Sequence, residues 1–162
     1  MAYHQSAWFA FGAALGAISA ALTGLLFVAV SIKSNVLMTS RNLSSRAAQS
    51  LTLFMTMVLT SLVLAAPQPR VALGIELVAL SLGSGVVMAV LDHRAGHAAD
   101  RSVANYLQRF SPNLVTPVLI AIGGVTLIVK VGGGFYWLLP AAIASLLAGV
   151  VSAWLVLVKV TS

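Results

Sequence analysis

The sequence has few charges. Only 7% of its 162 residues are charged and 60% are hydrophobic, and the mean hydropathy is +1.03. A soluble domain has about 25% charged residues, and nine Lys or Arg with three Asp or Glu are too few to cover one of this length. A water-soluble fold is therefore excluded, and the exterior is expected to contact the lipid bilayer.

Cysteine is absent, which excludes disulfides, cysteine-based zinc sites, iron–sulfur clusters and cysteine nucleophiles. No glycine-rich phosphate loop or clustered acid and base is present, and three histidines are too few to supply buried haem ligands. The sequence therefore predicts no enzyme and no cofactor. The net charge of +6 is read as a signal of membrane topology rather than of nucleic-acid binding.

Five apolar stretches reach or approach the roughly 20 residues that a helix needs to cross a bilayer. They cover residues 7–32, 47–66, 71–91, 114–131 and 135–158, with a polar loop at 92–113. Outer-membrane strands would alternate in polarity over about ten residues, and these runs do not. The predicted fold is thus all-α, a single polytopic transmembrane helix bundle over residues 1–162.

Turn residues separate two pairs of these stretches. Pro67-Gln68-Pro69-Arg70 divides the second from the third, and Gly132-Gly133-Gly134 divides the fourth from the fifth. The fourth stretch is the shortest, with Pro117 expected in its first turn, where a missing donor is tolerated. If this stretch re-entered the membrane without crossing it, the C-terminus would lie outside. Residues 1–7 contain no Lys or Arg, so the first stretch is expected to remain in the mature protein.

The positions of the cations predict the orientation, because positive residues near span ends stay in the cytoplasm. Seven cations fall on one side of a five-span arrangement, and they are Lys33, Arg41, Arg46, Arg94, Arg101, Arg109 and Lys159. Only Arg70 and Lys130 fall on the other side. The N-terminus is therefore predicted outside and the C-terminus in the cytoplasm, in a plasma membrane of the bacterial inner-membrane type. Aromatic residues at two of the predicted outer ends agree, and they are Tyr3, Trp8, Phe9, Phe135, Tyr136 and Trp137.

Two rows of small residues predict close helix packing, which in lipid depends on small side chains and interhelical hydrogen bonds. The first row is Gly12, Gly16, Ala20 and Gly24, and the second is Ala142, Ser145, Gly149 and Ser152. A contact within the chain and a contact with another chain both remain open for the first row.

Span two has a polar stripe on one face, formed by Ser45, Gln49, Thr52, Thr56 and Thr60. Threonine hydroxyls in a membrane helix can bond to the carbonyl four residues earlier, and then need no other partner. The functional alternative is that Thr52, Thr56 and Thr60 line a narrow path for an ion or small solute.

Glu76 is the carboxylate inside a predicted span, about 9 Å inward from Arg70 at about 1.5 Å per residue. An ionisable residue in a membrane helix is a functional candidate by default. Lys130 or Arg70 is also expected near the same interface, so a structural ion pair competes with a role in ion or proton coupling.

The polar loop contains His93, His97 and Asp100, which would share one face if the loop were helical. That spacing suits a divalent metal, but Gly96 disfavours the helix and solvated histidines are the simpler interpretation. The apolar face of Val103, Tyr106, Leu107 and Phe110 predicts a short amphipathic helix. It would lie on the membrane surface or bind a soluble partner.

Two functions remain. The first is a non-enzymatic accessory, assembly or regulatory subunit that packs with other membrane proteins or with itself. The second is a small oligomeric channel or carrier, with the threonine stripe and Glu76 on its path. The small-residue rows and the scarcity of charge within the spans favour the first.

Overall fold

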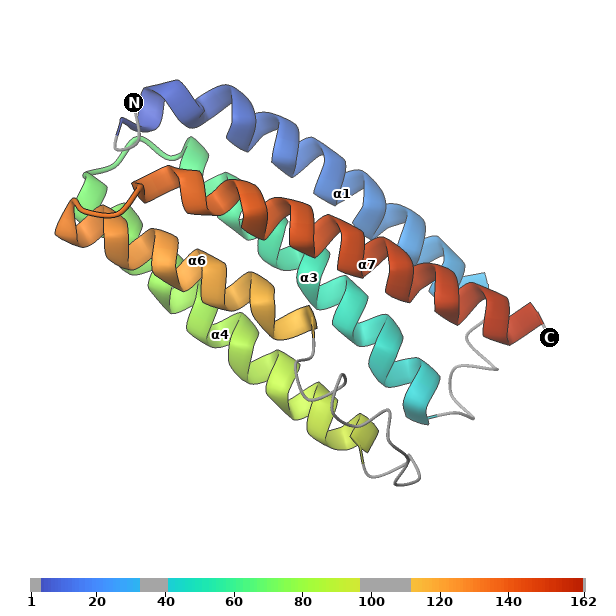
Figure 1. Ribbon diagram of the computed structural model, residues 1–162. Coiled ribbons are helices and arrows are strands. Elements are labelled where there is room, and N and C mark those ends of the chain that lie inside the picture. Colours follow the sequence, from blue (N-terminus) through green and yellow to red (C-terminus); the bar gives the residue numbers. More distant parts are fainter. Residues whose placement is uncertain (1–3, 33–40, 97–111, 162) are drawn as a thin grey trace.

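The residues that the structure describes form a bundle of five long helices, each antiparallel to the long helix before it (Figure 1). The computed structural model describes residues 4–32, 41–96 and 112–161, and these are almost entirely helical without a strand. The long elements are α1 (Phe9–Ile32), α3 (Arg41–Ala65), α4 (Arg70–Gly96), α6 (Pro112–Val129) and α7 (Leu138–Thr161). Two 3-10 helices, η1 (Gln5–Trp8) and η2 (Gly134–Trp137), precede α1 and α7. The predicted all-α class is confirmed.

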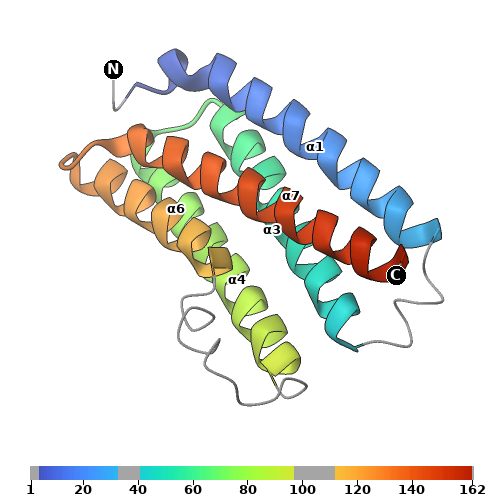
Figure 2. The same cartoon turned by 45° about the vertical axis from the view of Figure 1, so that its right-hand side comes forward.

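One end of the bundle contains η1 and the two predicted turns, and is called the turn end below (Figure 1). α3 ends before Pro67 and α4 begins at Arg70, because the two prolines remove backbone donors. Gly132, Gly133 and Gly134 all have positive φ (86°, 108° and 55°), a conformation that favours glycine. The C-terminal helix ends at the opposite end of the bundle (Figures 1 and 2).

Helix α3 lies at the centre of the bundle and α1 at its edge. α3 contacts α1, α4 and α7, whereas α1 packs almost entirely on α3. Over an apolar stretch of 18 residues in each helix, 56% of residues are buried in α3 and 17% in α1. Among the three remaining helices, α6 packs on α4 and on α7. Most of the surface of α1 therefore faces away from the bundle (Figure 2).

Four helices are long and apolar enough to cross a membrane, and α6 is shorter. Its apolar part is Leu114–Val129, about 24 Å at 1.5 Å per residue, against a hydrocarbon core of about 30 Å. The structure also corrects the expected position of Pro117. α6 begins at Pro112, so Pro112 starts the helix and Pro117 lies inside it rather than in its first turn.

At the end away from the turns, two helices continue past the apolar stretches that predicted them. α3 begins at Arg41, six residues before the predicted start, and α4 runs through Asp92 to Gly96. Hydropathy marks where side chains become polar, whereas a helix ends only where its backbone bonding stops. The first part of the predicted polar loop is therefore the last turn of α4.

Helices α4 and α6 cross at two glycines. A Cβ placed on Gly124 would lie 2.7 Å from the Gly74 carbonyl oxygen and 2.8 Å from Val78 Cγ2. A Cβ on Gly74 would lie 2.8 Å from the Gly124 carbonyl oxygen. The two backbones are thus in direct contact, which is possible only because neither residue has a side chain.

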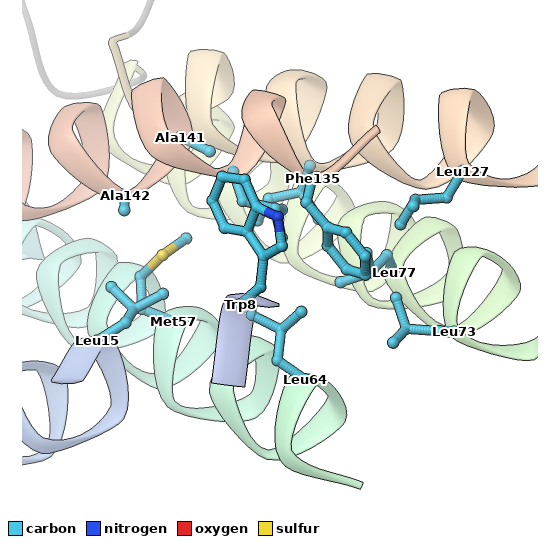
Figure 3. Close-up of a cluster of buried hydrophobic side chains, with 12 residues drawn as sticks. Trp8, Leu15, Met57, Leu64, Leu73, Leu77, Leu127, Phe135, Ala141 and Ala142 are labelled. Carbon is cyan, nitrogen blue, oxygen red and sulfur yellow. The ribbon is translucent and has the colours of Figure 1, made fainter. Parts of the chain in front are cut away.

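The aromatic residues of the turn end close the core (Figure 3). Trp8 is buried and stacks on Phe135, with ring centroids 5.8 Å apart and an interplanar angle of 28°. Its edge meets Tyr136 and Phe11, at centroid distances of 5.1 and 5.5 Å. Leucines from three helices lie beneath these rings, namely Leu64, Leu73, Leu77 and Leu127. η1 and η2 are therefore fixed to the bundle by ring contacts.

Candidate functional site

The first small-residue row divides between two environments. A Cβ on Gly12 would lie 3.2 Å from Leu64 Cβ, and one on Gly16 would overlap the side chain of Ser61, so both glycines pack on α3. Ala20 is exposed, and a Cβ on Gly24 would meet nothing within 4 Å. Four residues turn an α-helix by about 400°, so each step of the row moves about 40° around the axis. The row therefore leaves the α3 contact after two positions.

The side of α1 that faces away from α3 contains a second set of residues, which are small except for Val28. This set, the α1 outer stripe, alternates steps of four and three residues and is formed by Ala10, Ala14, Ala17, Ala21, Gly24, Val28 and Ser31. All seven are exposed. The side packed on α3 contains the buried residues Gly12, Leu15, Ser19 and Leu26. Steps of four and three keep residues on one face, so the outer stripe runs along the helix opposite α3.

The second row, on α7, lies inside the bundle. Ala142, Ser145 and Gly149 are buried, and a Cβ on Gly149 would collide with the ring of Phe54 on α3. Ser145 is fully buried, and its hydroxyl donates to the Leu53 carbonyl at 3.4 Å. The side chain of Ser152 lies outside the described residues. Ser145 and Gly149 therefore lie in the contact between α7 and α3.

The threonine stripe of α3 bonds to its own helix. Thr52, Thr56 and Thr60 each donate to the carbonyl four residues earlier, at 2.7–2.8 Å. Thr56 and Thr60 are buried and Thr52 is half-buried. Each hydroxyl proton is thus used locally, while the oxygen lone pairs remain available as acceptors. The role of the stripe as a path for a solute stays a prediction.

Glu76 bonds to a glutamine. It is exposed, and its Oε2 accepts a hydrogen bond of 2.7 Å from Gln68 Nε2. In the described chain it forms no ion pair with Arg70 or Lys130. Arg70 instead donates to the carbonyls of Leu127 and Ile128, at the end of α6. The ion-pair interpretation of Glu76 therefore has no support in this geometry, and its role in ion or proton coupling stays a prediction.

Side chains at the turn end satisfy carbonyls that the helix ends leave without intrahelical partners. Gln5 Nε2 donates to the Leu64 carbonyl at 2.8 Å and to the Ala66 carbonyl at 2.5 Å. Arg70 does the same for α6. Hydropathy and side-chain spacing had not revealed these caps, because the acceptors are backbone atoms distant in sequence.

At the other end, a polar contact joins α3 and α4. Gln49 Nε2 donates to Asp92 Oδ1 at 2.5 Å. His93 is exposed on the last turns of α4. The other two residues of the predicted metal site, His97 and Asp100, lie outside the described residues, as does the predicted amphipathic helix at 103–110. Among the residues that the structure describes, no group of three or more His, Cys, Asp or Glu is placed to hold a metal.

Comparison with protein families, curated proteins and solved structures finds no match for this chain.

Proposed function

We propose that this protein is a non-enzymatic membrane subunit that acts by packing against other membrane proteins or a second copy of itself. The observation that carries the proposal is the position of α1, which packs almost entirely on α3 and turns the α1 outer stripe away from the bundle. Helices in lipid associate through faces of small residues, because small side chains let the backbones approach. A face meant only for lipid needs no such residues.

The proposal includes a membrane topology. Large apolar side chains are exposed on every long helix, for example Leu25, Leu62, Leu82, Val118 and Leu147. Such a surface is typical of a chain surrounded by lipid. We place the turn end outside and the opposite end in the cytoplasm of a bacterial-type plasma membrane, with α6 as the shortest of five crossings. The excess of cations at the opposite end supports this orientation.

Single cysteines test the topology, since the chain has none of its own. An impermeant thiol reagent added to intact cells is expected to label Val131→Cys, at the turn end, and to spare Ser44→Cys. After the cells are opened, both are expected to react. Labelling of Ser44→Cys in intact cells would contradict the proposed orientation.

The packing role is tested through the mass of the protein extracted in a mild detergent. The wild-type chain of 16.8 kDa is expected in a larger species, either a multiple of itself or a complex with another protein. The double substitution Ala17→Leu and Ala21→Leu adds bulk to the outer stripe and is expected to release the monomer. Ala89→Leu, at an exposed alanine of α4, is the matched control and is expected to change nothing. A wild-type monomer, or equal behaviour of both variants, would refute the role.

One observation favours the second candidate, a small channel or carrier. Buried hydroxyls occur on four neighbouring helices, at Thr56, Ser81, Thr116 and Ser145. In proteoliposomes, combined substitution of Thr52, Thr56 and Thr60 by Val is expected to abolish flux while the bundle remains folded. Unchanged flux in this variant would show that the threonine stripe does not line the solute path.

A further inference from the structure

Thr116 is buried without a protein partner for its hydroxyl. The side chain lies on α6, is 0% exposed, and its Oγ1 forms no hydrogen bond. Burying a hydroxyl without a partner costs about 1–3 kcal/mol. Native proteins usually avoid that cost by placing a donor or acceptor nearby.

The register of α6 and α7 places Ser145 opposite Thr116. A Cβ on Gly123 would lie 3.4 Å from Trp137 Cβ and 3.6 Å from Leu138 Cδ2, so these residues face each other. Seven residues, about two helical turns, lead back along α6 from Gly123 to Thr116. Because the helices are antiparallel, the same step leads forward along α7 from Leu138 to Ser145. The two hydroxyls therefore lie on facing sides at one level of the core.

Ser145 is itself only weakly bonded. Its hydroxyl is 3.4 Å from the Leu53 carbonyl, whereas a good O–H···O bond measures about 2.5–3.0 Å. Two fully buried hydroxyls and one carbonyl thus lie at one level of the core. The hydrogen bond from Ser145 to the carbonyl is long, and the Thr116 hydroxyl forms none. The buried neighbours of Ser145 on α7 are small, namely Ala141, Ala142 and Gly149, and the ring of Phe54 packs against Gly149.

We propose that a buried water molecule binds between α3, α6 and α7, held by Thr116, Ser145 and the Leu53 carbonyl. A buried water typically has about three polar partners. Here Thr116 Oγ1 has no partner, Ser145 Oγ can accept a further hydrogen bond, and the Leu53 carbonyl of α3 receives only a long side-chain bond from Ser145. The three groups are uncharged, so they suit a neutral molecule that both donates and accepts. A bare ion at this depth would lack a compensating charge. The water links the helix that contains the α7 row to the central helix α3.

Double-mutant coupling tests the site. Thr116→Val keeps the shape of the side chain and removes its hydroxyl, and Ser145→Ala removes the other. Reversible unfolding in mixed micelles with increasing SDS gives the unfolding equilibrium constant. Each single variant is expected to unfold more readily. The pair is expected to be coupled by at least about threefold, because losing either hydroxyl releases the same water.

Thr116→Ser keeps the hydroxyl and is the matched control, and it is expected to combine additively with Ser145→Ala. Strict additivity of Thr116→Val and Ser145→Ala, or stabilisation by Thr116→Val alone, would overturn the proposal. A second measurement uses the wild-type chain in lipid. Solid-state NMR with magnetisation transferred from water is expected to show signals at Thr116 and Ser145, and no transfer to either residue would also overturn the site.

Discussion

The crossing of α4 and α6 provides the sharpest test of the packing. In Gly124→Ala the new Cβ would lie 2.7 Å from the Gly74 carbonyl oxygen, whereas ordinary contacts begin at 3.4 Å. The two backbones must therefore separate by about 0.7 Å, the difference between these distances. A gap of 0.5–1 Å forfeits roughly a quarter to a half of each dispersion contact. Overpacking of this kind costs about 1–3 kcal/mol.

The neighbouring residue is a matched control on the same helix. In Gly123→Ala the nearest atom to the new Cβ is Trp137 Cβ at 3.4 Å, which is an ordinary contact. Both substitutions gain the same helix propensity, about 1 kcal/mol from Gly to Ala, so their difference isolates the crossing. SDS unfolding is expected to show Gly124→Ala less stable than Gly123→Ala by about 1–3 kcal/mol. Equal stability of the two variants would refute the backbone contact.

Three further predictions concern the turn end and are read by the same unfolding measurement. Arg70→Gln is expected to lose about 1.5–3 kcal/mol, because the charged donor to the α6 carbonyls is removed; an unchanged midpoint would count against the cap. Gln5→Ala is expected to lose about 1 kcal/mol, since it releases two carbonyls at the end of α3, and a stable variant would show that η1 does not anchor there. Exchanging the charges of Glu76 and Lys130 is expected to give no mutual rescue, because Glu76 bonds to Gln68; recovery in the double variant would restore the ion-pair interpretation.

The helices and turns were predictable because their determinants are local. Apolar runs define the long helices, and the prolines at 67 and 69 and the three glycines at 132–134 end them. The helix ends were less predictable, as α4 shows by continuing through Asp92. The length of α6 was visible in the sequence, but the start at Pro112 was not, since a proline can either precede or begin a helix.

The contacts of the candidate residues were less predictable, because they depend on which helices become neighbours. The four-residue row on α1 predicts close packing, but its drift around the helix takes Gly24 away from α3. Arg70 was considered as a partner for Glu76, yet carbonyls at the end of α6 take its guanidinium. Backbone acceptors at a helix end have no signature in a side-chain pattern. That Thr116 and Ser145 face each other was likewise not predictable, because it depends on the register of α6 against α7.

The most direct test of the packing role is site-specific cross-linking in native membranes. The chain lacks cysteine, so a photoreactive maleimide can be attached to Ala17→Cys in the α1 outer stripe or to Leu82→Cys, which is also exposed, on α4. Irradiation is expected to join the Ala17→Cys chain to one defined protein, and the mass of the adduct distinguishes a second copy from another subunit. Leu82→Cys is expected to give no such adduct. Absence of an adduct at Ala17→Cys, or equal adducts at both positions, would contradict the proposed role.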